Sequence, residues 1–203
     1  QQTSDGGYII VGGIYSFPDN LDLYLLKTDA NGIEQWNQSY GDIANEDFGT
    51  DVQQTSDGGY IITGQTQNLT NGNETPFLLK TDENGIELWS QTYDVNYNYG
   101  RSVQQTSDGG YIIAGGDYNN SGFLIKTDSE GVEEWSQNIS LGSLYSVHQT
   151  NDDGFIVAGS SYSAAFIIKV DNSGIEQWLK SYDDPFTMNI ELISIEQTVD
   201  GGF

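Results

Sequence analysis

Hydrophobic residues occur along this chain in short runs, separated by stretches rich in Gly, Asn, Asp, Ser and Thr. Runs such as Tyr8–Val11 and Phe166–Ile168 are apolar at consecutive positions. Strict alternation would predict strands with one wet face, whereas consecutive apolar residues predict strands that are covered on both faces. Few Ala, Lys or Arg residues are present to support long surface helices. The pattern therefore predicts many short, buried β-strands joined by turns.

One segment recurs along the whole chain. Gln-Thr-Ser-Asp-Gly-Gly-Tyr stands at 2–8, 54–60 and 105–111, and looser copies stand at 149–155 and 197–203. The aligned acids, spaced by 52, 51, 44 and 48 residues, are Asp5, Asp57, Asp108, Asp152 and Asp200. Self-similarity at such a period is the signature of a repeat architecture.

A second signature, Lys-x-Asp-x-x-Gly-x-x-x-Trp, lies inside each repeat. Its lysines are Lys27, Lys80, Lys126 and Lys169, and its tryptophans are Trp36, Trp89, Trp135 and Trp178. The Asp-to-Trp interval is seven residues in all four copies, while the loops between signatures vary in length. A constant core with variable loops is what stacked supersecondary units predict.

Four strands are predicted per repeat. In the third repeat they are 102–106, 111–115, 123–127 and 132–139, with Asp-Gly-Gly and Asp-x-x-Gly turns as hairpin signals. Period, strand count and two-sided burial predict an all-β fold, a β-propeller of four-stranded blades of about 44–52 residues, with four repeats plus the start of a fifth. A parallel β-helix is the main rival, but its coils are shorter and lack two tight hairpins.

The predicted organisation is a single repeat domain over 1–203. The blades are approximately 1–50, 51–101, 102–146 and 147–194. Residues 195–203 are the start of a further blade, or a closing or exchanged strand. The chain opens within the motif at Gln1, with no signal peptide, as expected for a mature piece or a fragment.

Both motifs carry a family resemblance. Gln-Thr-x-Asp-Gly-Gly-Tyr-Ile-Ile-x-Gly followed by Lys-Thr-Asp-x-x-Gly-x-x-x-Trp resembles the propeller-type repeats of exported bacterial and archaeal surface proteins. The half with the turn and the tryptophan is also similar, more distantly, to quinoprotein-like propeller repeats. The resemblance covers essentially the whole chain and implies a propeller in an extracytoplasmic setting. It implies no activity, because no catalytic motif defines these repeats, and no set of quinoprotein cofactor ligands is found.

The net charge of the chain excludes some classes of binding partner. Thirty acidic residues against six basic ones give a formal net charge of −24. Such a chain repels nucleic acid and anionic membrane surfaces. Cysteine is absent, which excludes disulfides and thiolate sites, and no apolar run is long enough to cross a membrane. Together with the Asn, Ser and Thr content, this predicts an extracellular or cell-surface location.

The repeated polar residues have structural and ligand-binding interpretations. We expect each Asp of Asp-Gly-Gly to cap its own turn, and each tryptophan to pack between blades. We expect the repeated lysines to pair across their hairpins with Glu34, Glu87, Glu133 and Glu176. The turns of the first and second repeats offer oxygen ligands for Ca²⁺, the one cofactor considered, at Asp29, Asn31, Asp82 and Asn84.

The variable loops hold the candidate ligand-binding residues. The aromatic ones are Tyr15, Phe17, Tyr97, Tyr99, Tyr118, Tyr145 and Tyr162. Sequons for N-glycosylation stand at Asn37, Asn68, Asn73, Asn119 and Asn138. The one histidine, His148, has no nucleophile motif beside it, so a catalytic triad is not indicated.

These observations predict a non-catalytic extracellular structural or adhesive module that is not an enzyme. The partner is protein, through self-association or another surface protein, or glycan. The spare fifth repeat suggests assembly into filaments by strand addition. Two alternatives stay open: a glycan- or protein-binding propeller using its loop aromatics, and a polysaccharide hydrolase or lyase with an acidic funnel.

Overall fold

The computed structural model describes residues 1–16, 20–94, 99–117, 121–161, 164–183, 190–198, 200 and 202–203. These residues form antiparallel strands joined by turns, and none of them is assigned to a helix. In particular, they include no helix that is long and apolar enough to span a membrane. The prediction of an all-β fold is confirmed.

The strands follow one another along the chain with short connections. They are β1 (Tyr8–Ser16), β2 (Asn20–Thr28), β3 (Glu34–Tyr40), β4 (Asn45–Gln54), β5 (Tyr60–Asn68), β6 (Glu74–Thr81), β7 (Glu87–Thr92), β8 (Tyr99–Gln105), β9 (Tyr111–Gly116), β10 (Gly122–Thr127), β11 (Glu133–Ile139), β12 (Ser143–Gln149), β13 (Phe155–Ser160), β14 (Ala165–Val170) and β15 (Glu176–Tyr182). In the third repeat, β8 to β11 match the four predicted strands to within a few residues.

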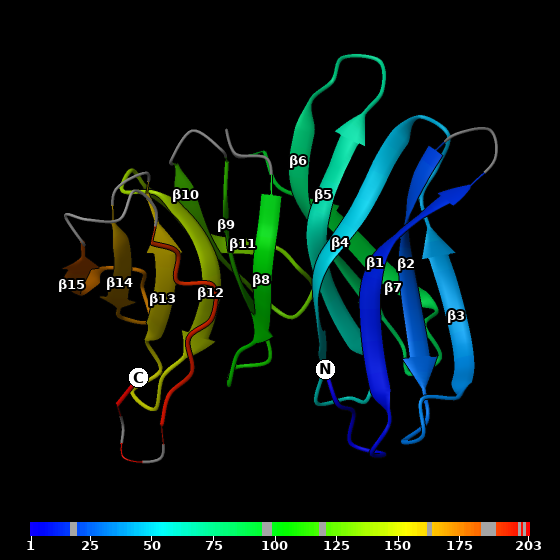
Figure 1. Cartoon of the computed structure of the whole chain (residues 1–203), viewed down its shortest axis with the longest axis horizontal. Coiled ribbons are helices and arrows are strands. Elements are labelled where there is room, and N and C mark those ends of the chain that lie inside the picture. The colour runs from blue at the N-terminus through cyan, green and yellow to red at the C-terminus, as the bar shows by residue number, and fades with distance from the viewer. Residues whose placement is uncertain are drawn as a thin grey trace. The chain divides into compact units, whose positions relative to one another are not determined.

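Each sheet is an antiparallel meander, as Figure 1 shows. The described strands form a three-stranded sheet, β1-β2-β3, and three four-stranded sheets, β4-β5-β6-β7, β8-β9-β10-β11 and β12-β13-β14-β15. The last three begin at Asn45, Tyr99 and Ser143, a few residues ahead of the predicted boundaries, because the first strand of each sheet extends upstream of its motif. The number of blades and the closure of a ring stay predictions.

The chain divides into two compact units, residues 1–100 and 101–203, which are described separately. In the first unit, Ile9, Leu23 and Leu25 pack with Val52, Tyr60 and Ile62 of the next sheet. In the second unit, Ile112 and Leu124 pack in the same way with Val147 and Val157. Every residue of β9 and β10 is buried, which confirms strands covered on both faces in this sheet. For Tyr8–Val11 the prediction was wrong, because no described sheet covers the face of β1 on which Tyr8 and Ile10 are 41% and 47% exposed.

Candidate functional sites

The Asp-Gly-Gly turn has the same hydrogen bonds in every described copy. In the first, Asp5 Oδ1 accepts hydrogen bonds from the Thr3 hydroxyl at 2.5 Å and from the Gly7 N–H at 2.9 Å. The equivalent acceptors are Asp57, Asp108, Asp152 and Asp200. The prediction that each of these acids caps its own turn is confirmed.

The partner of each repeated lysine was predicted wrongly. Lys27 forms an ion pair of 2.8 Å with Asp5 of its own Asp-Gly-Gly turn rather than with Glu34. A β-bulge between Lys27 and Thr28 places Lys27 opposite Trp36 and Thr28 opposite Glu34. The same bulge and the same pairing recur in the other three sheets, so Glu87, Glu133 and Glu176 are not the partners either. The observed pairs are Lys80–Asp57, Lys126–Asp108 and Lys169–Asp152, and Lys126 also pairs with Glu134.

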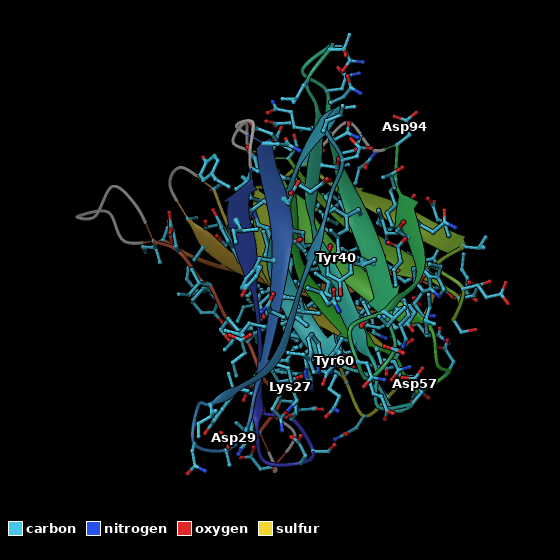
Figure 2. The ribbon with its side chains drawn as sticks, turned by 90° about the vertical axis from the view of Figure 1, so that its right-hand side faces the viewer. Lys27, Asp29, Tyr40, Asp57, Tyr60 and Asp94 are labelled. Carbon is cyan, nitrogen blue, oxygen red and sulfur yellow. The ribbon has the colours of Figure 1, made fainter. Side chains whose placement is uncertain are left out.

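The lysine ammonium is buried and held by several acceptors. Lys27 is 4% exposed, and its Nζ donates to the Thr28 carbonyl and the Gln35 side chain as well as to Asp5. Any side chain on Gly7 would collide with this ammonium and with the Thr28 carbonyl. The second glycine of the motif is therefore required mainly by the close approach of the Thr28 backbone carbonyl. We call the Thr, Asp, Gly-Gly and Lys of one sheet the turn clamp; Figure 2 shows Lys27 and Asp57 toward one end of the first unit's strands.

Charge in the turn clamp is reflected in the carboxyl pKa values. The pKa of Asp5 lies well below its ordinary range, mainly because of the hydrogen bond from Lys27, with Thr3 and Gly7 adding to it. At Asp108, burial acts to raise the pKa, but hydrogen bonds from Thr106, Lys126 and Gly110 outweigh it and bring the value to about 2. These carboxylates are ionised and engaged, so they are structural groups.

The second acidic turn is also closed by its own aspartate. Asp29 Oδ1 accepts hydrogen bonds from the N–H groups of Asn31 and Ile33, both at 2.8 Å. Asp82 Oδ1 accepts the equivalent bonds from the N–H groups of Asn84 and Ile86. The predicted Ca²⁺ ligands thus lie together within each turn, with one oxygen of each aspartate occupied by backbone donors. Among the described residues, no group of three Asp, Glu or His side chains has an arrangement that could hold a metal ion.

Within each unit, a repeated tryptophan contacts the aromatic residue that follows the next turn of the repeat. Trp36 meets Tyr60 with ring centroids 5.7 Å apart, and Trp135 meets Phe155 at 5.9 Å. The indole N–H of Trp135 donates to the Asn172 carbonyl of the following sheet. Within each unit, the prediction that these tryptophans pack between sheets is confirmed.

The candidate loop aromatics are only partly described. Tyr15, at the end of β1, is 78% exposed. Tyr145 is half-buried and lies under the Arg101 guanidinium, 4.8 Å from the ring centroid, and Tyr99 is also half-buried. Phe17, Tyr97, Tyr118 and Tyr162 lie outside the described residues. Among the candidates that the structure describes, Tyr15 is therefore the most exposed.

The sequons differ in how their side chains are engaged. Asn37, Asn73 and Asn138 are exposed, while Asn68 is half-buried and its side-chain oxygen accepts the N–H of Thr70. Asn119 lies outside the described residues. Exposure at three sequons is compatible with glycosylation, which stays a prediction.

A pocket of about 480 Å³ in the first unit was not predicted from the sequence. Its floor is apolar and its rim carries acids and amides; the lining is Leu23, Tyr40, Gly41, Asp42, Asn45, Asp47, Phe77, Leu79, Glu87, Ser90, Gln91 and Thr92. Burial raises the pKa of Asp47, a hydrogen bond from Thr66 opposes this, and the charges of Asp42 and Asp22 raise it further. Glu87 belongs to the repeated glutamates, but Asp42 and Asp47 belong to no repeated motif, so no sequence signal marked this site.

Comparison with known proteins identifies the class of fold. The solved structure of the Dos1 propeller matches 80% of this chain with a TM-score of 0.56 at 16% sequence identity. The chain spans 44% of the length of that propeller. No protein-family model matches the sequence. No curated protein matches it either. The chain therefore has a propeller-type fold.

Proposed function

We propose that this chain is a non-catalytic structural or adhesive module of an extracellular surface. The observation that carries the proposal is that the repeated polar residues form contacts within their own sheets. The Asp of each Asp-Gly-Gly, the lysine and the Asp of each Asp-x-x-Gly are engaged in contacts that hold their own sheet. A catalytic site needs unlike residues that converge at one place. The repeated residues of this chain instead stabilise their own sheets.

Charge and composition support the extracellular setting. A net charge of −24 keeps such a module soluble and disfavours nucleic acid and anionic lipid as partners, so protein and glycan are the partner classes that fit. Absence of cysteine makes the fold independent of the redox state of its surroundings.

The experiment has two readouts. Antibodies against the chain should label intact, unpermeabilised cells of the source organism, and incubation with a panel of surface polysaccharides should release no reducing ends. Labelling only after permeabilisation would contradict the location. Release of reducing ends that is lost in Asp47→Asn would contradict the non-catalytic role, because Asp47 is the pocket carboxyl with a raised pKa.

Glycan binding is a second candidate, favoured by the pocket in the first unit. Its apolar floor of Leu23 and Phe77, beside the amide and carboxyl groups of its rim, suits a sugar with one apolar face. Glycan-array binding that is weakened by Asp47→Asn and unchanged by Tyr15→Ala would assign the ligand to the pocket. The reverse pattern would assign it to the loop aromatics.

A further inference from the structure

The pocket of the first unit is lined by both of that unit's sheets. β2 and β3 contribute Leu23 and Tyr40, the connection to β4 contributes Asp42, and β6 contributes Phe77. All of its lining residues lie between positions 23 and 92, well inside the first unit. Its volume of about 480 Å³ falls within the range that is usual for small-molecule sites, about 300–1,000 Å³.

Hydrogen bonds between side chains and backbone hold the walls of this pocket in place. The Tyr40 hydroxyl, at the end of β3, donates to the Gly85 carbonyl of the second sheet at 2.5 Å. The side chain of Asn20 is buried, and its amide donates both to the Asp42 carbonyl and to the Asp22 carboxylate. The pocket is therefore formed before any ligand arrives, which lowers the cost of binding.

Carboxylates of one sign surround the pocket. Asp42, Asp47 and Glu87 are among the residues that line it. The Asp22 carboxylate lies so close to Gly41 of the lining that any side chain at Gly41 would collide with it. No lysine, arginine or histidine belongs to the lining, so these acids have no opposite charge beside them within the pocket.

The lysines of the first unit are committed elsewhere. Residues 1–100 contain fifteen acids and two lysines, Lys27 and Lys80. Both lysines are 4% exposed and form ion pairs with the aspartates of their Asp-Gly-Gly turns. Lys27 lies opposite Trp36, four residues along β3 from Tyr40 (Figure 2). A positive charge for the pocket therefore has to come from a ligand or from ions in solution.

The negative charge of the pocket affects the titratable groups in its lining. Burial raises the pKa of Tyr40, and the charges of Glu87 and Asp82 raise it further. Burial also raises the pKa of Asp47, and the charge of Asp42 adds to this effect. A cation bound in the pocket would relieve the repulsion at both groups.

The other lining residues distinguish between kinds of cation. Leu23, Phe77 and Leu79 form an apolar floor, against which a metal ion gains nothing. The amides and hydroxyls of the lining are those of Asn45, Ser90, Gln91 and Thr92. A sugar ring has an apolar face for the floor and hydroxyls for these polar groups. A lysine side chain has an apolar stem but no hydroxyls, so the sugar uses more of this lining.

We infer that this pocket binds a sugar that carries a free ammonium group, such as a hexosamine unit of a glycan. The ring packs on the apolar floor and the ammonium pairs with the pocket carboxylates, through charge-assisted hydrogen bonds that are stronger than neutral ones. Asp47 is half-buried, whereas Asp42 and Glu87 are exposed, so the pairing with Asp47 is screened least. The inference rests on glycan binding, the second candidate function above, and specifies the charge of the glycan.

Three oligosaccharides of equal length and linkage separate the effect of charge from that of shape. They are tetramers of glucosamine, of N-acetylglucosamine and of glucose, and calorimetric titration of the 203-residue chain measures their dissociation constants. The glucosamine tetramer should bind about tenfold more tightly than either neutral tetramer at low salt. High salt should reduce this preference, because the rim carboxylates are exposed and their charges are screened.

Substitutions that remove one charge test the site. Asp47→Asn keeps the shape of the side chain and an acceptor for the Thr66 hydroxyl, so the fold should be retained, and thermal unfolding checks this. It should weaken binding of the glucosamine tetramer about tenfold and that of the glucose tetramer less. Glu87→Gln, at the exposed rim, should give a smaller loss in the same direction. Glu130→Gln is the matched control, because it removes the same charge from an exposed residue of the second unit.

The outcomes separate this inference from the function on which it rests. Equal affinity for the three tetramers would overturn the inference and leave glycan binding standing, whereas failure of all three to bind would overturn both. Equal losses in Asp47→Asn and Glu130→Gln would also overturn it, because the preference would then arise from net charge alone. Tighter binding of a lysine-rich peptide, lost in Asp47→Asn, would assign the pocket to a protein partner instead.

Discussion

The first sheet, β1 to β3, and the second, β4 to β7, carry the same Tyr-Ile-Ile strand in two environments. Ile9 and Ile61, the middle residues, are both fully buried. Their neighbours differ: Tyr8 and Ile10 are 41% and 47% exposed, while Tyr60 and Ile62 are 1% and 0% exposed. Tyr60 and Ile62 belong to the core that includes Ile9, Leu25 and Trp36 of the first sheet.

This difference shows that two-sided burial belongs to stacked sheets and not to the strand sequence. In the second sheet, Tyr60 and Ile62 of β5 pack against Ile9 and Leu25 of the first sheet. In the first sheet, Ile9 packs with Val52 of β4, whereas no described sheet covers Tyr8 and Ile10. The isoleucine at this position is buried in the second sheet and partly exposed in the first.

Matched truncations should give the largest effect. Ile62→Ala removes a fully buried side chain from the core between the two sheets and should lower the free energy of unfolding by about 3 kcal/mol. Ile10→Ala, the same exchange at the equivalent position of β1, should cost about 1 kcal/mol or less in the monomer. Urea denaturation at low protein concentration measures both. Equal losses would mean that β1 is covered in solution, which would remove the contrast between the sheets.

The turn clamp should behave alike in both sheets because all of its contacts lie within one sheet. Asp57→Ala leaves the buried ammonium of Lys80 without its carboxylate. The cost is about 2 kcal/mol, less than for a fully buried pair, because the Asp57 side chain is 58% exposed. Asp5→Ala should also lower the denaturation midpoint. Glu87→Ala is the control, since Glu87 was the partner expected from the sequence, and a larger loss there than in Asp57→Ala would reverse the assignment.

The turns could be predicted from the sequence because they depend on neighbouring residues. The ion-pair partners of the lysines could not, because they depend on the register between strands. Asp caps and glycines at positive φ depend on neighbouring residues, so Asp5, Gly6 and the hairpins could be read directly. The partner of Lys27 depends on a bulge that shifts the strand pairing by one residue, and no residue pattern marks that bulge. The pocket acid Asp47 is likewise unrepeated and is brought to its site by the packing of two sheets.

Acid should remove the contribution of the turn clamp to the free energy of unfolding, and the third sheet allows this to be tested. The pKa of Asp108 is about 2 when folded, below its ordinary value of 3.8, so its stabilisation is fully present above pH 4 and is lost as the pH falls toward 2. Asp108→Asn should therefore be less stable than the wild type by about 1 kcal/mol at pH 6, a figure reduced for exposure of the carboxylate. The two curves should converge near pH 2. A difference that stays constant from pH 6 to pH 2 would show that charge is not involved.

The smallest effect concerns the one turn that departs from the motif. Asp153 stands where the other turns have Gly6, Gly58 and Gly109, and it adopts their left-handed conformation, with φ of 62° against 83°, 89° and 87°. Relief of that strain in Asp153→Gly is offset by the greater freedom of glycine in the unfolded chain and by loss of the hydrogen bond from Ser107 to Asp153. The net gain should be about 0.5 kcal/mol. The reverse exchange, Gly109→Asp, should cost about 1 kcal/mol in the third sheet because it introduces the strain without that hydrogen bond. Thermal unfolding of the two variants gives the comparison, and shifts of the same sign would mean that the backbone conformation of this turn does not determine its residue.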